Sequence, residues 1–287
     1  MKVCVVGLGL LGGSFSLKLK LINPDVKIIG VDCNEENGEK ALELGIADEL
    51  VDFEEGIKIA DLVVLATPVN VLLQQLISAL HYLKEGATLM DLGSTKAELC
   101  RIADTHPRRG RYVAAHPIAG TENSGPEAAF SGLLERKTII VCDRQNSDKD
   151  ALEFVEDLFK NLEMKVLHMK ANDHDRHIAY VSHLSHISSF ALGSTVLDIE
   201  KDERTIFAMA GSGFSSTARL AKSSPGMWAP ILTQNRKNII KALDAYIDKL
   251  QHFRSMIDNE DEDGSYNLMK ETNNIRRVLK GKRKDEE

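Results

Sequence analysis

The chain of 287 residues is long enough for one large domain or two modest ones with a sizeable core. Hydrophobic residues make up 43% and charged residues 28%, and no run of 18 apolar residues occurs, which excludes a membrane-spanning helix. The net charge of −7 disfavours nucleic acid, because its binding needs a basic surface. The chain opens directly on a strand pattern and has no CxxC pair, so we expect no signal peptide and a cytoplasmic location.

Short apolar runs alternate with helical stretches up to about residue 168. The runs are β-branched and bounded by Gly, Pro or Asp, as expected of buried parallel strands. Helices are expected over Asn34–Leu44, closed by Gly45, and over Val69–Leu83, closed near Gly86. This alternation predicts a Rossmann-type, doubly wound α/β domain with a mainly parallel sheet over residues 1–169. The runs are KVCVVG, VKIIGVD, ADLVVLATP, GATLMDLGS, RYVAAHP, KTIIVC and MKVLHM.

The first run leads into VVGLGLLGGS, which places Gly7, Gly9 and Gly12 in G-x-G-x-x-G spacing at the start of a helix. The first glycine allows a tight turn, the second lets the backbone approach a pyrophosphate, and the third permits close helix–strand packing. Asp32 ends the second run, 20 residues after Gly12, where a carboxylate accepts hydrogen bonds from a ribose and repels a 2′-phosphate. The CNEEN that follows contains no Arg or Lys, so the pattern predicts NAD rather than NADP.

Thr67 and Pro68 end the run that begins at Asp61, at the sheet edge where ligands bind in open α/β sheets. For Thr67 and Pro68 the alternative is a plain proline that ends the strand. For the glycine motif the alternative is a turn that packs the helix and binds no ligand. The predicted cofactor contacts are Gly7, Leu8, Gly9, Leu10, Leu11, Gly12, Asp32, Thr67 and Pro68.

Two later strand ends carry side chains that suit a reaction. DLGSTK leaves Ser94 and Lys96 in one loop, and AAHPIAGTE leaves His116 at the end of the next strand. These loops converge on the cofactor cleft, where a neutral imidazole with a pKa near 6.5 suits accepting a hydroxyl proton as a hydride leaves. Ser94 could hold that hydroxyl or orient the ring. A structural histidine is the alternative, whereas a nucleophilic Ser94 is disfavoured because no G-x-S-x-G elbow surrounds it.

From about Ala171 onward, strands give way to apolar residues at three- and four-residue spacing. We predict a helical domain over 170–287 that pairs with a second copy of the chain, with Ser224 and Pro225 starting one helix. The acidic segment 258–265 is expected to be a loop and residues 281–287 a solvated tail. The helical stretches are 173–199, 202–221, 225–257 and 266–280.

Four histidines within 13 residues raise the question of a metal site: His174, His177, His183 and His186. On a straight helix the first and third lie about 180° apart, as do the second and fourth, so the four cannot reach one ion. His183 and His186 lie about 60° apart and can face one pocket, but two imidazoles make a poor zinc site. We therefore predict no metal, which leaves core or interface histidines and contacts to an anionic substrate.

Arg219 lies in GSGFSSTARLAKSSPGMW, on a predicted helix that precedes the only tryptophan, Trp228. Its guanidinium suits a bidentate pair with a substrate carboxylate. An ordinary ion pair between helices is the alternative.

Together these motifs resemble the prephenate/arogenate dehydrogenase family. GLGLLGGS with Asp32, ATPV, DLGSTK, HPIAGTE, HDRHIAYVSHLSH and TARLAKSSPGMW occur in the family's order from residue 3 to about 250. The resemblance implies NAD-dependent oxidative decarboxylation of prephenate to 4-hydroxyphenylpyruvate in tyrosine biosynthesis, or of arogenate to tyrosine. It also implies a homodimer that assembles through the helical domain.

The resemblance further implies roles for individual residues. His116 would take the proton of the ring hydroxyl, and Ser94 would assist at the same oxygen. His186 and Arg219 would contact the carboxylates of the substrate. His183, Asp175 and Glu122 would support the substrate site.

One position departs from the family pattern. Family members often have Phe-Arg-Asp where this chain has Phe214-Ser215-Ser216, so we expect Glu122 to lack its arginine partner, which affects gating and substrate preference. We expect neither a chorismate mutase segment before Met1 nor a regulatory ACT domain after the last helices. Inhibition by tyrosine would then act at the active site or at the dimer interface.

Two other classes of protein would share parts of this pattern. β-Hydroxyacid dehydrogenases and imine-type reductases have a similar sheet and helical domain, but usually rely on a lysine and an asparagine where this chain has histidines. An NAD-sensing dimeric regulator would need the glycine motif, but not His116, Ser94 and Arg219 together.

Overall fold

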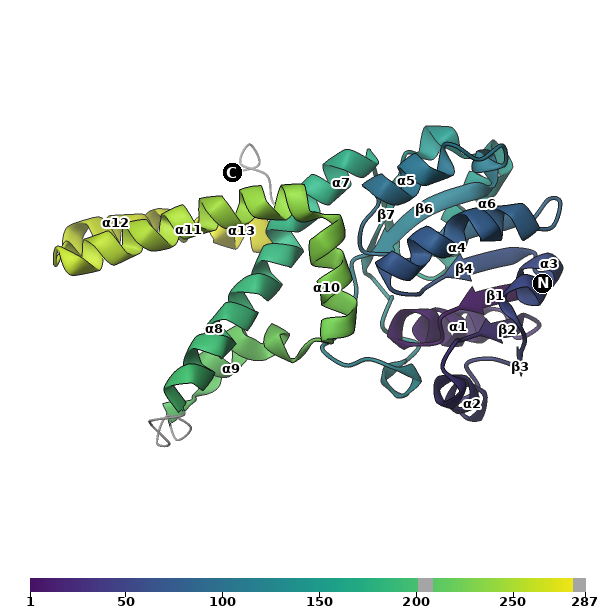
Figure 1. Cartoon of the computed structure of the whole chain (residues 1–287), viewed down its shortest axis with the longest axis horizontal. Coiled ribbons are helices and arrows are strands. Elements are labelled where there is room, and N and C mark those ends of the chain that lie inside the picture. Colours follow the sequence, from purple (N-terminus) through teal and green to yellow (C-terminus); the bar gives the residue numbers. More distant parts are fainter. Residues whose placement is uncertain (201–208, 281–287) are drawn as a thin grey trace. The chain divides into compact units, whose positions relative to one another are not determined.

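An eight-stranded sheet forms the centre of the N-terminal part in the computed structural model, which describes residues 1–200 and 209–280 (Figure 1). The strands lie in the order β3-β2-β1-β4-β5-β6-β7-β8, so the order reverses between β1 and β4 as in a doubly wound sheet. The predicted Rossmann-type fold is therefore confirmed. The strands are β1 (Lys2–Val6), β2 (Lys27–Val31), β3 (Glu49–Leu50), β4 (Leu62–Leu65), β5 (Thr88–Asp91), β6 (Tyr112–Pro117), β7 (Thr138–Cys142) and β8 (Lys165–Met169).

The last two strands run opposite to the first six. β7 pairs antiparallel with β6, so the prediction of a parallel strand is wrong for KTIIVC, whereas MKVLHM forms β8 and pairs parallel with β7. The segment between β6 and β7 holds a 3₁₀ turn (Pro126–Ala128) but no α-helical crossover, which is what usually returns a chain for parallel pairing. β8 also lies at the edge of the sheet and is largely exposed rather than buried.

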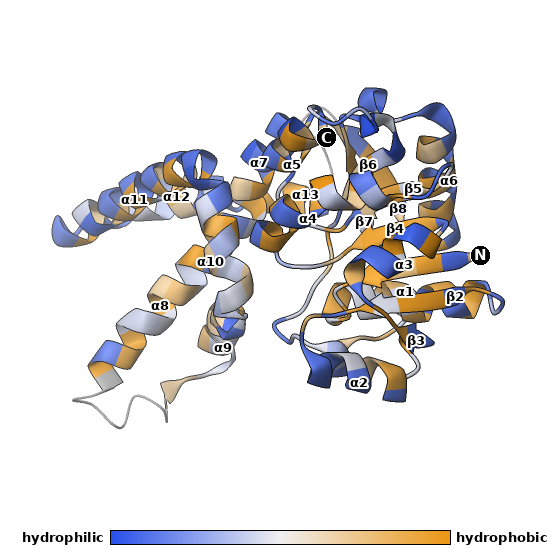
Figure 2. Ribbon diagram, turned by 45° about the vertical axis from the view of Figure 1, so that its right-hand side comes forward, coloured by the Kyte–Doolittle hydropathy of each residue, from blue (hydrophilic) through white to orange (hydrophobic). Residues whose placement is uncertain are grey.

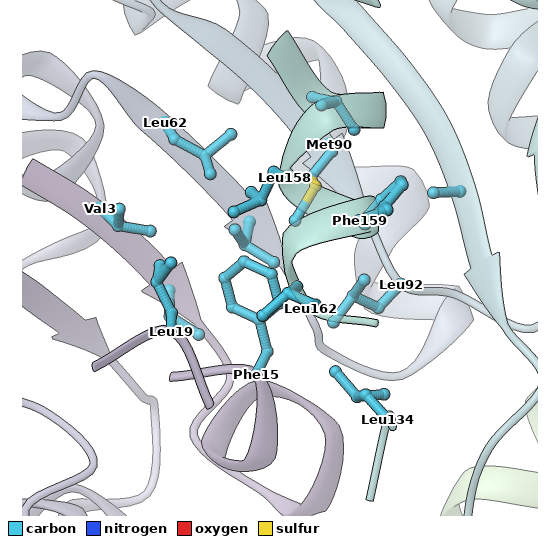
Figure 3. Packing of buried hydrophobic residues seen from close by; sticks show 14 of the residues in the cluster. Val3, Phe15, Leu19, Leu62, Met90, Leu92, Leu134, Leu158, Phe159 and Leu162 are labelled. Atoms are coloured by element: carbon cyan, nitrogen blue, oxygen red, sulfur yellow. The ribbon is translucent and has the colours of Figure 1, made fainter. Parts of the chain in front are cut away.

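Helices cover both faces of the sheet because successive residues of each strand point to opposite sides. In β1, Val3 and Val5 pack toward α1 and α6, whereas Cys4 and Val6 pack toward α3, α4 and α5. Figure 3 shows the first of these cores, in which Phe15 lies among Leu62, Leu158 and Leu162. The helices are α1 (Leu10–Ile22), α2 (Glu35–Glu43), α3 (Phe53–Ile59), α4 (Val69–Tyr82), α5 (Ala97–Ala103) and α6 (Lys149–Asn161).

The two helices predicted from their ends are confirmed as α2 and α4. Asn34 caps α2 by accepting a hydrogen bond from the backbone N–H of Asn37, and Gly45 follows with a φ of +68°. In Figure 2 the sheet strands are mainly orange, while α2 shows blue on its outer side, as expected of an amphipathic helix over a buried sheet.

Beyond β8 the described residues contain helices and no strand. The predicted helical stretch over 173–199 is confirmed, but it is not one regular α-helix, because a π-helical turn (Ala179–His183) joins α7 (Ala171–Ile178) to α8 (Leu184–Glu200). Residues 202–208 of the next predicted helix lie outside the described residues. Ser212–Lys222 are helical, and α10 begins at the predicted Pro225. The remaining elements of this part are α9 (Ser212–Ala218), a 3₁₀ turn (Arg219–Lys222), α10 (Pro225–Gln234) and the start of α11 (Arg236–Asp258).

The chain divides into two units, Met1–Ile239 and Ile240–Glu287. The second unit holds the rest of α11, α12 (Glu262–Thr272) and α13 (Ile275–Leu279). The prediction of a loop over 258–265 is wrong from Glu262 onward, because Asp261 caps α12 through the N–H of Gly264 and acidic residues favour a helix N-terminus. The predicted tail 281–287 lies outside the described residues.

Over the ranges that the structure describes, no helix is both long and apolar enough to cross a membrane.

Candidate active site

A cavity of about 1090 Å³ opens at the carboxyl ends of β1, β2 and β4, where the strand order reverses. Gly7 and Gly9 line it after β1, Asp32 lines it after β2, and Thr67 and Pro68 line it after β4. The loop residues 124–127 form another part of the wall. Four predicted cofactor contacts do not line the cavity: Leu8, Leu10, Leu11 and Gly12.

The geometry of the glycine loop explains these residue types. Gly7 has a φ of +94°, which disfavours any side chain, and a Cβ on Gly12 would lie 2.0 Å from the carbonyl oxygen of Gly7. A Cβ on Gly9 would meet no atom closer than 4.0 Å, so its absence leaves open space beside the backbone. Such space is what a pyrophosphate needs in order to approach the N-terminus of α1.

Asp32 ties the glycine loop to the end of β2. Its carboxylate accepts hydrogen bonds from the N–H of Leu8 at 2.9 Å and of Asn34 at 3.0 Å. Lys40 also lines the cavity and was not predicted, but its ammonium already pairs with Glu43 at 3.0 Å and with Glu127 at 3.6 Å. The cavity, the open backbone at Gly9 and the carboxylate at Asp32 together fit an adenine dinucleotide without a 2′-phosphate.

His116 lies at the end of β6, 8% exposed. Its Nδ1 is 2.8 Å from Nε2 of His174 on α7, and Nδ1 of His174 is 2.8 Å from Oδ1 of Asp175. Burial lowers the pKa of His116 well below 6.5, and the positive charge of Lys96 lowers it further. His116 is therefore neutral at pH 7, the state in which an imidazole accepts a proton.

Ser94 follows β5, the parallel neighbour of β6. The register pairs Met90 with Val113, so the loop after β5 and His116 lie at the same edge of the sheet. Ser94 is half-buried, and within residues 1–200 and 209–280 its hydroxyl has no hydrogen-bond partner. A free hydroxyl at that edge is available to a bound molecule.

The loop that carries Ser94 is held by a buried ion pair that the sequence did not reveal. The ammonium of Lys96 contacts Oδ2 of Asp91, and both side chains are fully buried. Asp91 also accepts hydrogen bonds from the hydroxyl of Tyr112 at 2.7 Å and from the N–H of Gly93 at 2.8 Å. The carboxylate of Asp91 thus joins the loop to β6.

His186 and His183 surround Trp228 of α10. The His186 ring stacks on the indole with a centroid distance of 3.6 Å, and His183 meets it edge-on at 5.7 Å. Nδ1 of His186 lies 3.0 Å from the carbonyl oxygen of Ser182, which fixes the proton on Nδ1 and leaves Nε2 bare in the neutral ring. Burial lowers the pKa of His186, and that of His183 to about 4.

Arg219 pairs with Glu122 at 2.9 Å, through Nη1 and Oε2. The prediction that Glu122 lacks an arginine partner is therefore wrong, because Arg219, one turn beyond the exposed Ser215, supplies it. The Arg219 side chain is 51% exposed, so the rest of its guanidinium can meet a ligand. The pKa of Glu122 is lowered first by a hydrogen bond from its own backbone N–H and second by the hydrogen bond from Arg219.

Asp175 and His183 are both buried and engaged. The Asp175 carboxylate accepts hydrogen bonds from the N–H of Lys96 at 2.7 Å and of Ala97 at 2.9 Å, besides its contact with His174. Nδ1 of His183 lies 3.2 Å from Nδ2 of Asn235, which also donates to the carbonyl oxygen of Asp175. Their burial and these contacts suit holding neighbouring groups in place rather than touching a substrate.

Among the described residues, no group of three or more His, Cys, Asp or Glu side chains could hold a metal ion. The prediction treated His174 only as one of four spaced histidines and did not place it beside His116. The pair His174-Asp175 was a usable signal, because an adjacent carboxylate commonly orients a functional imidazole. Trp228, Asn235 and Lys96 carried no such signal, since their partners are distant in the sequence.

Comparisons with known proteins place the whole chain beside one family. A family model described as the nucleotide-binding domain of prephenate dehydrogenase matches residues 15–168, and one described as the prephenate dehydrogenase dimerization domain matches residues 170–271. The chain is 33% identical to the prephenate dehydrogenase of Bacillus subtilis over 277 residues. This alignment covers 96% of this chain and 75% of that relative.

Solved structures are similar over nearly the whole chain. The prephenate dehydrogenase from A. aeolicus in complex with hydroxyphenyl propionate and NAD⁺ has a TM-score of 0.88 and 33% identity, covering 97% of this chain and 98% of that chain. The Synechocystis arogenate dehydrogenase has a TM-score of 0.76 and 26% identity, covering 97% of this chain and 100% of that chain.

Proposed function

This chain belongs to the prephenate dehydrogenase family, and we propose that it converts prephenate to 4-hydroxyphenylpyruvate by NAD-dependent oxidative decarboxylation in tyrosine biosynthesis. The observation that carries the proposal is the neutral His116 at the sheet edge that also holds the free Ser94 hydroxyl. This edge continues into the cavity that fits the dinucleotide, with Gly7, Gly9 and Asp32 as its main contacts. NAD⁺, when bound, supplies the hydride acceptor.

The residues of the chain then accept one proton from the substrate and return it to the product. As C4 of the ring loses its hydride, His116 accepts the proton of the C4 hydroxyl, and Ser94 holds the same oxygen. Loss of the ring carboxylate as CO₂ leaves its bonding electron pair in the ring, which becomes aromatic. The phenol of the product keeps its O–H, so His116 returns the proton to that oxygen and no net proton leaves the site.

The helical elements supply the contacts to the substrate. We propose that Arg219 and His186 bind its carboxylates, His186 through a ring that the charge of the bound substrate keeps protonated, while Glu122, His183 and Asp175 hold these two groups in place. Arg219 uses Nη1 toward Glu122, and within the described part of the chain its other guanidinium N–H groups have no partner, so they can form a charge-assisted pair.

Replacing Arg219 by Ala is expected to raise the KM for prephenate about 10-fold or more, and to lower kcat by less. A charge-assisted carboxylate contact holds the ground state and the transition state alike. Steady-state kinetics give both constants. Arg176→Ala is the matched control, because Arg176 is an exposed arginine that pairs with Asp173 of the same helix. An unchanged KM in the Arg219 variant contradicts the assignment.

The reaction itself is tested by adding NAD⁺ with prephenate or with arogenate to the purified protein. We expect NADH to form together with 4-hydroxyphenylpyruvate from prephenate, and kcat/KM to be higher with NAD⁺ than with NADP⁺. Absence of NADH with both substrates would overturn the proposed function.

Arogenate is a second candidate substrate, which differs by an amino group in place of the keto group. The proton on Nδ1 of His186 leaves Nε2 as an acceptor, which suits an ammonium donor, whereas a carboxylate requires the protonated ring. A higher kcat/KM with arogenate than with prephenate in the same assay would favour this candidate.

We propose a functional division of the chain into a nucleotide-binding domain, 1–169, and a helical substrate and dimerisation domain, 170–287. The match to a dimerization domain over residues 170–271 supports a homodimer. A cytoplasmic location remains our proposal and rests on the four free cysteines, Cys4, Cys33, Cys100 and Cys142.

A further inference from the structure

Three side chains stand in line behind the site of reaction: His116, His174 and Asp175. Nδ1 of His116 lies 2.8 Å from Nε2 of His174, and Nδ1 of His174 lies 2.8 Å from Oδ1 of Asp175. All three residues are buried, with exposed fractions of 8%, 1% and 5%. Bulk water therefore does not replace any partner in this chain of contacts.

The position of each proton follows from what its partner can do. The ionised carboxylate of Asp175 only accepts hydrogen bonds, so Nδ1 of His174 carries the proton. Nε2 of the neutral His174 ring is then bare and accepts, so Nδ1 of His116 carries the proton. Nε2 of His116 is consequently bare, and it is the nitrogen not engaged with His174.

The carboxylate that sets this order is itself fixed. Asp175 accepts hydrogen bonds from the N–H groups of Lys96 and Ala97, at 2.7 and 2.9 Å. Lys96 and Ala97 belong to the segment that follows Ser94. The Asp175 carboxylate therefore orients the histidines and also anchors the loop that carries the Ser94 hydroxyl. Its backbone oxygen also accepts a hydrogen bond from Asn235 at 2.6 Å, which holds α7 against the start of α11.

We propose that His174 and Asp175 are positioning residues that keep Nε2 of His116 bare and stabilise the imidazolium while it holds the substrate proton. This inference rests on the proposed function and deepens it. When Nε2 of His116 forms its bond to the hydroxyl proton, the O–H bond breaks and the ring becomes positive. Nε2 of His174 then accepts the hydrogen bond from Nδ1 of His116 more strongly, because Asp175 accepts a hydrogen bond from Nδ1 of His174.

We call His116, His174 and Asp175 the relay. Its arrangement suits a reaction in which His116 holds a proton and then returns it. The phenol of the product keeps its O–H, so the proton needs no path to solvent and the positive charge is transient. A buried imidazole without an acceptor on its second nitrogen would bear that charge alone in a poorly polarisable site. The neighbouring ammonium of Lys96, although paired with Asp91, lowers the pKa of His116 and so adds to the cost of that charge.

The test combines ¹⁵N NMR of the histidine rings with kinetics of two variants. In the wild-type protein without substrate, we expect the proton of His116 on Nδ1 and a bare Nε2. In His174→Leu the ring loses its acceptor, and we expect its proton to move to Nε2. The kcat of this variant should fall about 10²–10³-fold, with unchanged KM for prephenate and unchanged NAD⁺ affinity, since tautomer errors cost up to about 10⁴-fold in the serine protease triad.

His174→Gln provides a partial rescue. The amide oxygen of Gln accepts the Nδ1–H of His116 but cannot pass charge to Asp175, so we expect the tautomer to be retained and kcat to recover about 10-fold over the Leu variant. His177→Leu is the matched control on the same helix, because His177 is exposed. Its kcat and the His116 tautomer should equal those of the wild type.

The inference is overturned by a wild-type His116 protonated at Nε2, by a wild-type kcat in His174→Leu, or by equal impairment of the Leu and Gln variants. The NMR result requires no turnover. It therefore decides the tautomer even if the protein oxidises neither prephenate nor arogenate, and if His174→Leu fails to fold, the wild type and His174→Gln still decide.

Discussion

Replacing His116 by Asn is expected to lower kcat by about 10²–10⁴-fold while NAD⁺ binding survives, because removal of a positioned general base costs about that much. Asn can still hydrogen-bond to His174 but cannot take a proton from the substrate hydroxyl. The cavity that fits NAD is lined by the ends of β1, β2 and β4, and His116 is not among its lining residues. Steady-state kinetics and fluorescence titration with NAD⁺ measure the two effects separately.

The matched control is His81→Asn, since His81 is an exposed histidine at the end of α4. It should keep the wild-type kcat. A His116 variant with near-normal turnover would return this residue to a structural role, and loss of NAD⁺ binding in the same variant would point to a damaged sheet edge rather than to lost chemistry.

The protonation of His116 also sets the direction of two pH effects. Burial keeps the folded-state pKa well below 6.5, so the residue stays a competent proton acceptor until the pH falls through that low value. The acid limb of kcat/KM that belongs to His116 therefore lies well below pH 6.5 and is absent from His116→Asn. Below 6.5 the unfolded chain binds a proton that the folded site excludes, so this histidine lowers stability progressively as the pH falls.

The sequence was sufficient for those parts of the site that follow from local pattern. The glycines of the first turn, Asp32 at the end of β2 and His116 at the end of β6 are placed by strand boundaries alone, because the carboxyl ends of parallel strands meet at one edge. The spacing of these motifs therefore predicted which residues gather at the cavity and at the reacting edge.

Contacts that join distant segments could not be predicted from the same pattern. His174 lies 58 residues from His116 in sequence, and the orientation of its ring depends on where α7 packs against the sheet. A straight helix would have set the face of His183 and His186, but the π-helical turn over Ala179–His183 shifts that face. The partner of Glu122 was sought at position 215 because of the family pattern Phe-Arg-Asp, although Arg219 supplies it.

Replacing Lys96 by Met is expected to lower the free energy of unfolding by about 3–5 kcal/mol, because it leaves the carboxylate of Asp91 buried without its counter-ion. Both side chains of the pair are fully buried, so water cannot take the place of the ammonium. The hydrogen bonds from Tyr112 and Gly93 remain but do not neutralise the charge. Urea unfolding of the variant and the wild type measures the difference.

A matched surface pair separates this effect from the loss of any lysine. Lys84 pairs with Asp61, and their side chains are 45% and 44% exposed, so Lys84→Met should cost less than about 1 kcal/mol. The double variant Asp91→Asn with Lys96→Met removes both charges and should recover much of the stability, since neutral groups of similar size avoid the unpaired buried charge. If Lys96→Met costs no more than Lys84→Met, the ion pair does not hold the loop of Ser94, and the hydrogen bonds of Asp175 to that loop must position it instead.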